Sequence, residues 1–154
     1  MKKFFIIVLL FTVPMLTVLS GADKVIGADA EHIGNIKMGK GSVRIGHNAD
    51  VTGNIFIEEG DLFLGEEVNI TGSITIKKGN IFIKSNADIT KNVTVLKGNI
   101  TMGNNNDIHA DVACKNGTVR MGANNDIHGD VYAMQLKRGA NSDIQGKFHK
   151  TPGK

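Results

Sequence analysis

The sequence predicts an all-β fold, a single-stranded β-helix of about six rungs, each rung being one turn of three short strands. Three observations lead to this prediction. A 19-residue repeat runs through most of the chain. Apolar residues within each repeat come in pairs spaced i, i+2, which is the strand period with one face buried. Glycine and Asx residues recur at fixed positions between those pairs, as tight corners require.

Residues 1–22 have the layout of a secretory signal peptide. A basic start, MKK, precedes the apolar run FFIIVLLFTVPMLTVL, and small residues end at Ala22. The run is short for a membrane span and is interrupted by Pro14. We therefore expect export to the periplasm, the cell surface or the medium. The alternative is an uncleaved membrane anchor, and either way the folded part is expected to lie outside the cytoplasm.

Charge and cysteine content narrow the class of protein. The formal net charge is +3, and loss of Lys2 and Lys3 with a cleaved leader lowers it to +1. Nucleic-acid binding needs a concentrated field of Lys and Arg, so no nucleic-acid partner is expected. Cys114 is the single cysteine of the chain, which excludes an intramolecular disulfide. It falls in an apolar column and is expected to be a small buried residue.

The repeat divides the rest of the chain. Residues 23–32 are predicted as a short N-terminal extension, residues 33–148 as the β-helix and residues 149–154 as a C-terminal tail. Successive repeats begin 19 residues apart, except for a last interval of 17 residues. The repeat starts are Gly34, Gly53, Gly72, Lys91, Ala110, Gly129 and Gly146. Stacking is predicted because one such repeat cannot bury its apolar face alone.

Each rung is predicted to contain three strands and three corners. The first strand begins at Ile36, Ile55, Ile74, Val93, Val112 and Val131. The second strand carries apolar pairs such as Val43 with Ile45, and the third contains Val51, Ile70, Ile89, Ile108, Ile127 and Ile144. Corner glycines precede the second strand at Gly41, Gly60, Gly79, Gly98 and Gly117. At the third corner the predicted turn residues are Asp50, Asn69, Asp88, Asp107, Asp126 and Asp143.

The run GNIKMGKGSVRIGHNADVTGNIFIEEGDLFLGEEVNITGSITI resembles the bactofilins, small polymer-forming bacterial cytoskeletal proteins. The likeness covers about residues 33–148 and depends on V-x-G-N/D-I entries and I-G-x-N-A corners. It implies a right-handed, three-sided β-helix that joins end to end into filaments without nucleotide. It also implicates an apolar residue of the final rung, which here is Phe148. An exported chain and Asn-rich corners such as GNNNDIHAD depart from the family pattern.

End-to-end association is also expected on physical grounds. The terminal rungs of a solenoid expose strand edges and an open core unless they are capped. Residues 23–32 and the tail KTPGK are too short or too polar to form an obvious cap. The residues predicted for self-association are Phe148, Ile144 and Val131 at one end and Ile36 and Val43 at the other. The alternative is a monomeric rod whose short tails cover its ends.

Four aromatic side chains are predicted to face outward. Phe63 and Phe82 occupy one column of the second strand on successive rungs and should stack. Phe56 and Tyr132 face outward on the first strand. This exposed aromatic patch is interpreted either as cross-strand stabilisation or as a contact site for another rod or a glycan.

His109 and His128 share one outward column on adjacent rungs. With Asp107 or Asp126 nearby, they are weak candidates for a metal site. The alternative is a merely polar column, because its other members are Thr52, Thr71, Thr90 and Gln145. No metal or other cofactor is therefore predicted.

Exposed charges are expected to pair between neighbouring rungs. Glu58 and Glu59 lie one repeat from Lys77 and Lys78, and Lys40 lies one repeat before Glu59. Such pairs contribute a few tenths of a kcal/mol each when exposed.

The function predicted best is that of a non-enzymatic structural or scaffold protein of the cell envelope that polymerises with itself. The alternative is a secreted adhesin or a glycan-binding rod, with peptidoglycan or another envelope glycan as partner. A β-helical acyltransferase or polysaccharide-active enzyme is less favoured. His47 is the single corner histidine to consider for acyl transfer, and no insertion is long enough to form a groove or pocket.

Overall fold

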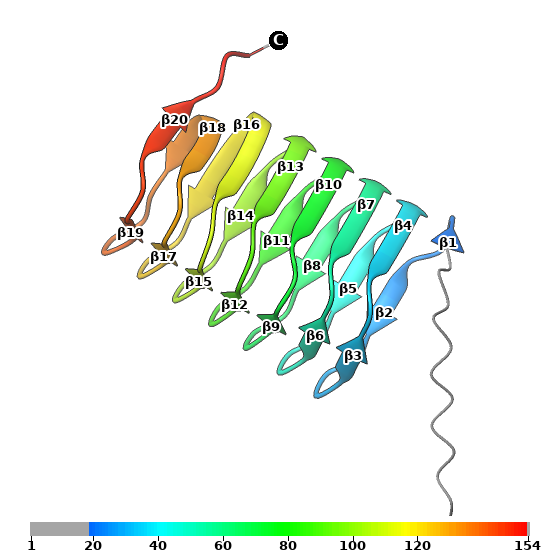
Figure 1. The fold of residues 1–154 in the computed structure, drawn as a ribbon. Coiled ribbons are helices and arrows are strands. Elements are labelled where there is room, and N and C mark those ends of the chain that lie inside the picture. Colours follow the sequence, from blue (N-terminus) through cyan, green and yellow to red (C-terminus); the bar gives the residue numbers. More distant parts are fainter. Residues whose placement is uncertain (1–18, 154) are drawn as a thin grey trace, which may run out of the picture.

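The computed structural model describes residues 19–153, which form an elongated stack of β-helical rungs (Figure 1). The predicted all-β fold is confirmed. Most of the predicted signal peptide, residues 1–18, lies outside the described residues, so that assignment stays a prediction. Within the described part of the chain, no helix is long and apolar enough to cross a membrane.

The first strand of each rung forms one continuous side of the stack. These strands are β1 (Leu19–Ser20), β4 (Ile36–Lys40), β7 (Ile55–Glu59), β10 (Ile74–Lys78), β13 (Val93–Lys97), β16 (Val112–Met121), β18 (Val131–Lys137) and β20 (Phe148–Lys150). Every described pair in this series is parallel. From β4 to β16 the register follows the repeat, as in Ile55 with Ile74 and Ile74 with Val93, whereas it shifts between β1 and β4 and between β16 and β18.

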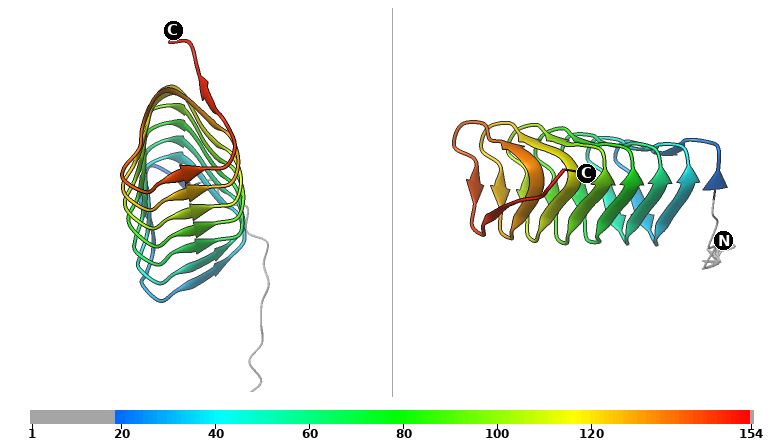
Figure 2. Two further views of the ribbon diagram at one scale, coloured as in Figure 1. Left: turned by 90° about the vertical axis from the view of Figure 1, so that its left-hand side faces the viewer. Right: turned by 90° about the horizontal axis from the view of Figure 1, so that it is seen from above.

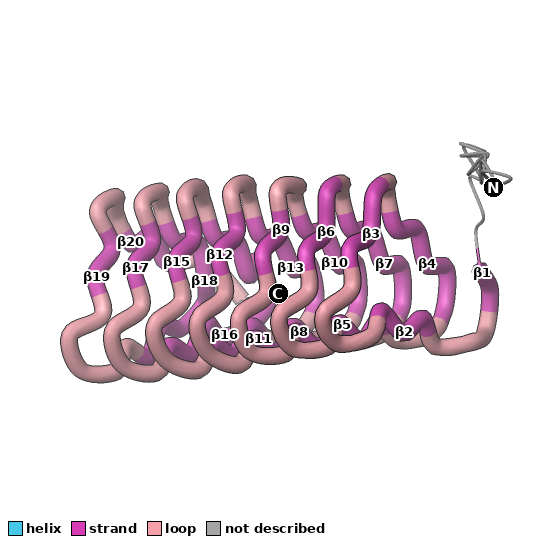
Figure 3. The backbone as a smooth tube through the Cα atoms, turned by 90° about the horizontal axis from the view of Figure 1, so that it is seen from below, coloured by secondary structure: helices cyan, strands magenta, loops and turns pink. Residues whose placement is uncertain are grey.

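The second and third strands form the remaining sides. Second strands are β2 (Lys24–Ile26), β5 (Val43–Ile45), β8 (Leu62–Leu64), β11 (Ile81–Ile83) and β14 (Ile100–Met102), continued by the C-terminal halves of β16 and β18. Third strands are β3 (Glu31–Ile33), β6 (Asp50–Thr52), β9 (Asn69–Ile70), β12 (Asp88–Ile89), β15 (Asp107–Ile108), β17 (Asp126–Ile127) and β19 (Asp143–Ile144). Figures 2 and 3 show the flattened rungs along the stack and from the side of the third strands.

The stack contains one rung more than expected. Strands β2 and β3 pair with β5 and β6, so residues 24–33 form a rung rather than the predicted short extension outside the β-helix. The third strands accordingly form a sheet of 7 strands. The tail also begins later than expected, because β20 runs to Lys150 and pairs with β18.

The short last interval of the repeat has a local cause. Between β16 and β18, Cys114 pairs with Ala133, whereas the next recorded pair is Thr118 with Gln135. The rung that contains β18 is therefore two residues shorter at its first corner, which in the rung before contains Gly117. Beyond that corner the stacking resumes, and Asp126 pairs with Asp143.

Stacked glycines are needed at the first corner. Gly41, Gly60, Gly79 and Gly98 have φ values between 116° and 149°. A Cβ atom on Gly60 would collide with the carbonyl oxygen of Gly41 in the rung before it. A side chain here would therefore meet both an unfavourable φ and the neighbouring backbone.

The third corner differs from the prediction. Its left-handed residues lie two positions before the predicted column, with φ between 52° and 61°. They are Asp29, Asn48, Glu67, Asn86, Asn105, Asn124 and Asn141. The predicted residues, such as Asp50 and Asp88, instead begin the third strands. The correction follows from the backbone, because Asx side chains are common in both settings and only one of the two has positive φ.

The core is a single apolar cluster running the length of the rod. Its three corner-facing members Ala49, Val68 and Ala87 are followed in the same column by Asn106, Asn125 and Ser142, which are also buried. The amide nitrogen Nδ2 of Asn106 donates to Oδ1 of Asn125 at 2.8 Å and to the carbonyl oxygen of Lys84 at 3.0 Å. Because these polar groups are hydrogen-bonded, their burial does not leave them unsatisfied.

Candidate functional site

The C-terminal rung is the apolar end of the rod. Phe148 continues the core column of Val131 by backbone register, yet it is 42% exposed because no strand among the described residues covers it. Ile144 and Leu136 pack against the core and are only half-buried. This end therefore presents three apolar side chains beside the free edges of β19 and β20.

An ion-pair and stacking cluster fixes β20 to β18. The carboxylate of Asp130 accepts hydrogen bonds from the backbone N–H of Lys147 at 2.8 Å and from the hydroxyl of Tyr132 at 3.1 Å. Nε2 of His149 lies 3.0 Å from the same carboxylate, and the His149 ring stacks on Tyr132 with centroids 4.7 Å apart. The backbone N–H of Lys147, followed by His149, holds the pKa of Asp130 below its usual value. The hydrogen bond to Asp130 raises the pKa of Tyr132.

The N-terminal rung is polar where the other rungs are apolar. By register, Lys24 lies in the core column of Val43, and His32 lies in that of Val51. Nε2 of His32 is buried and has no hydrogen-bond partner. Burial, followed by the charge of Lys24, lowers the pKa of His32. An inward-pointing charged residue such as Lys24 discourages edge-to-edge pairing.

Lys24 and His32 were missed by the sequence analysis. Extending the 19-residue register one step back from Val43 and Val51 would have found both. The prediction of self-association is wrong for three residues, because they are buried. Ile36 and Val43 are buried in the rung that follows the N-terminal one, and Val131 is buried beneath β20. Of the predicted set, Phe148 and Ile144 remain partly accessible.

The outward aromatic side chains form one pair rather than one patch. The rings of Phe63 and Phe82 stack with centroids 5.1 Å apart and planes 9° apart. The guanidinium of Arg44 lies 4.1 Å from the Phe63 centroid on the other side, and Phe82 is 38% exposed. A shallow hollow of about 500 Å³ runs beside Phe63 and Phe82. The sequence prediction of a stacked column is correct for these two residues.

Phe56 and Tyr132 lie elsewhere. Both are on first strands, with β10, β13 and β16 between β7 and β18, and both are half-buried. The ammonium group of Lys77 lies 5.2 Å from the Phe56 ring centroid, and Tyr132 belongs to the Asp130 cluster. Neither therefore contributes to the face that holds Phe63 and Phe82.

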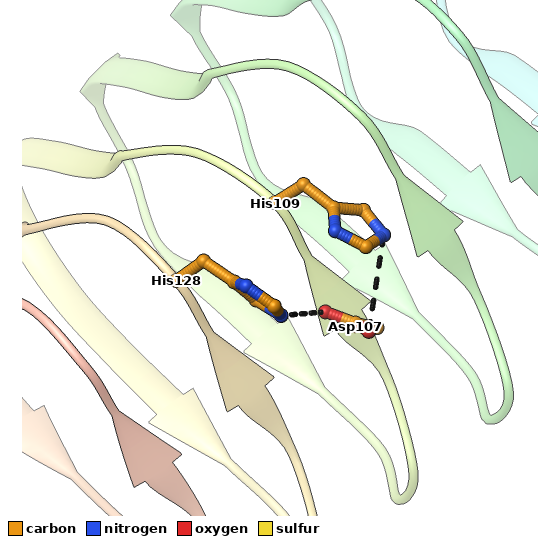
Figure 4. Close-up of side chains that lie close together, drawn as sticks. All are labelled: Asp107, His109 and His128. Atoms are coloured by element: carbon orange, nitrogen blue, oxygen red, sulfur yellow. Dashed lines mark ion pairs between the residues drawn. The ribbon is translucent and has the colours of Figure 1, made fainter.

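The histidine column brings three carboxylates and two imidazoles together. Figure 4 shows Asp107 with its two imidazole neighbours, His109 and His128. His109 Nε2 lies 3.1 Å from Asp88 Oδ1 and 3.8 Å from Asp107 Oδ2. His128 Nε2 lies 3.0 Å from Asp107 Oδ1 and 3.9 Å from Asp126 Oδ2. The two rings are 4.8 Å apart between centroids and tilted by 42°. Asp143 continues the acidic column on the last third strand.

Two further sequence expectations concern structural residues. Lys77 pairs with Glu58 at 2.9 Å, and Glu59 pairs with both Lys78 at 2.7 Å and Lys40 at 3.4 Å, as predicted. Cys114 is buried, and desolvation raises the pKa of its thiol to about 11. A protonated, enclosed thiol is a poor nucleophile.

No family model, no curated protein and no solved structure matches this chain.

Proposed function

We propose that this protein is a non-enzymatic structural rod that self-associates through its ends, with the C-terminal rung as the contact surface. A single observation carries the proposal. The core column that is closed everywhere else along the rod ends in an exposed Phe148, next to the free edges of two strands. Covering an aromatic side chain of this kind on association is favourable.

The two ends differ in what association would cost. Continuing the register from one copy to the next would place Lys24 over Leu136 and His32 over Ile144, inside an apolar core. Burying an unpaired ammonium group is costly. Two C-terminal rungs meeting each other would instead cover Phe148, Ile144 and Leu136 of both copies. We therefore assign the first contact to the C-terminal ends.

The structure supports the scaffold class through its regular stacking. Corners in the described residues are short, and their side chains bond to the backbone of the neighbouring rung, as Asn80 does to Asn99 and Asn54 to Ser73. These hydrogen bonds between rungs make the rod rigid. They do not enclose a cavity in which a reaction could take place. With the leader predicted at residues 1–22, the proposed place of the scaffold is the cell envelope, and the bactofilin-like pattern is consistent with this role.

The test is the oligomeric state of the full-length chain and of two matched variants. Phe148→Arg changes the exposed aromatic residue of the end, whereas Phe82→Arg changes an almost equally exposed one on the side. Sedimentation velocity should show concentration-dependent association, to dimers or to larger assemblies, for the parent chain and for Phe82→Arg, and monomers for Phe148→Arg. Circular dichroism shows whether both variants fold.

The outcomes separate the alternatives. Dimers that grow no further indicate contact through the C-terminal ends alone, and filaments in electron micrographs indicate that the N-terminal rung also takes part. Monomers of the parent chain at all concentrations, or assemblies that persist in a folded Phe148→Arg variant, would overturn the proposal.

A second candidate function is glycan binding by the side of the rod. It is favoured by the stack of Arg44, Phe63 and Phe82 beside an open hollow, because aromatic faces and planar donors suit sugar rings. Co-sedimentation with insoluble peptidoglycan tests it. Retention that is lost in Phe82→Ala but kept in Phe56→Ala supports this function, and equal retention of both variants or no retention contradicts it.

A further inference from the structure

We propose that Asp107, His109 and His128 form a binding site for a divalent transition-metal ion, with Zn²⁺ as the best fit. Each residue offers one ligand atom, and these atoms all lie within 4.8 Å of one another. Two ligands of a tetrahedral zinc ion lie about 3.3 Å apart, so modest rotations of the two imidazoles close the site. Figure 4 shows both rings turned toward the same carboxylate.

The backbone places the ligands before any ion arrives. The amide N–H of His109 donates to the carbonyl oxygen of Ile89 at 2.9 Å, and that of His128 donates to Ile108 at 2.9 Å. Asp107 pairs by register with Asp88 on one side and Asp126 on the other. The ligands therefore come from neighbouring rungs of a rigid ladder, which lowers the entropy cost of binding.

The negative charge of the aspartate column beside the two histidines favours the binding of a cation. Asp88, Asp107, Asp126 and Asp143 follow one another on successive third strands. Like charges directly opposite each other on neighbouring strands are destabilising. Within residues 19–153, Asp88, Asp107 and Asp126 have histidines as ion-pair partners and no Lys or Arg. A divalent ion bound in this column reduces the repulsion between these carboxylates.

Unsatisfied oxygen atoms provide a second, independent indication. Oδ1 of Asp107 is buried and has no hydrogen-bond partner, although it lies 3.0 Å from Nε2 of His128. The contact is thus at ion-pair distance without hydrogen-bond geometry. Oδ1 of Asp88 and Oδ1 of Asp126 are buried and unpartnered in the same way. Buried acceptors without donors are costly, and a metal ion would satisfy the one at the centre of the column.

The donor set selects the class of metal. Two imidazole nitrogens and one carboxylate oxygen suit zinc, copper or nickel better than the hard cations Ca²⁺ and Mg²⁺, which prefer oxygen ligands throughout. The side chains of His109 and His128 are 39% and 35% exposed, so solvent can complete the coordination sphere. Asp88 Oδ1 lies 3.1 Å from Nε2 of His109 and Asp126 Oδ2 lies 3.9 Å from Nε2 of His128, so both carboxylates add negative charge beside a bound cation.

Two other histidines of the chain serve as internal controls for metal binding. His47 and His149 also face carboxylates, of Asp29 at 4.0 Å and of Asp130 at 3.0 Å, but neither is paired with a second histidine. Titrating the full-length chain with Zn²⁺ alone, observed by NMR of the histidine rings, should shift the signals of His109 and His128 and leave those of His47 and His149 unchanged. Co²⁺ alone should give visible absorption bands.

Variants make the assignment specific. His128→Gln should abolish binding, and His149→Gln should leave the affinity unchanged. Asp88→Asn should weaken the affinity by about tenfold, because it removes a negative charge beside the bound ion. Zn²⁺ should also raise the melting temperature of the parent chain, because it binds the folded state and joins two rungs. Absence of shifts at His109 and His128, or equal binding by the parent chain and a folded His128→Gln variant, would overturn the proposal and leave two histidine–aspartate ion pairs.

Discussion

Phe148 stacks in register on Val131, and these two neighbours in one core column differ sharply in environment. Val131 is fully buried, whereas Phe148 is 42% exposed. The difference arises because β20 covers Val131 and no described strand covers Phe148. The last position of this stacked column is therefore where the apolar core of the protein reaches solvent.

The two residues should respond differently to truncation. Val131→Ala should lower the free energy of unfolding by about 2 kcal/mol, because it leaves a cavity in a closed column. Phe148→Ala should lower it by about 1 kcal/mol or less in the monomer, since much of the side chain is already in water. Urea unfolding at a concentration below that of association measures both. A larger loss of unfolding free energy for Phe148→Ala than for Val131→Ala would contradict the exposure of Phe148 at the C-terminal end of the rod.

Acid should release the C-terminal strand. The folded-state pKa of Asp130 is lowered, so its contribution to stability is present above the unfolded-state pKa of about 3.9 and is lost as the pH falls through the lower folded-state value. The protection factors of the amides of residues 147–150 against hydrogen exchange should fall in that acidic range. Asp130→Asn should exchange faster at neutral pH and lose this acid dependence. An unchanged profile in the variant would exclude Asp130 as the titrating group.

The buried Asn106 and Asn125 should be coupled. Asn125 Oδ1 accepts from both the backbone N–H and the side-chain amide of Asn106. Asn125→Ala should therefore cost about 1–3 kcal/mol by leaving buried donors unpaired. The double variant, Asn106→Ala with Asn125→Ala, should cost less than the sum of the single changes, because it restores the small residues found at Ala49 and Ala87. Additive losses in urea unfolding would show that the two amides act independently.

Glu67 should be replaceable with a gain in stability. It has φ of 58° in a column where every other member is Asn or Asp. Left-handed backbone is less unfavourable for Asn than for a longer side chain, so Glu67→Asn should raise the free energy of unfolding by about 0.5–1 kcal/mol. Glu66→Asn, next to it without positive φ, is the matched control and should change stability little. Thermal unfolding of both variants provides the comparison.

Much of the architecture could be predicted because each rung repeats the same chemistry. The columns of Ile55, Ile74 and Val93 follow directly from the 19-residue period, and the cross-rung pairs of Glu58 and Glu59 follow from the same spacing. The left-handed corner was placed two residues too late, at Asp50 instead of Asn48. Composition could not separate these positions, since both columns are rich in Asx residues.

The sequence by itself determined the period, the strand order and which side chains point inward, because these are local and repeat along the chain. Only the tertiary structure decided where the stacking ends. Lys24 and His32 belong to the N-terminal rung, and Phe148 remains open at the other end. It also decided that His109 and His128 converge on Asp107, because side-chain rotamers and the neighbouring rungs set those distances. Whether a residue in a repeated column is buried depends on the presence of the next rung, and a column pattern does not contain that information.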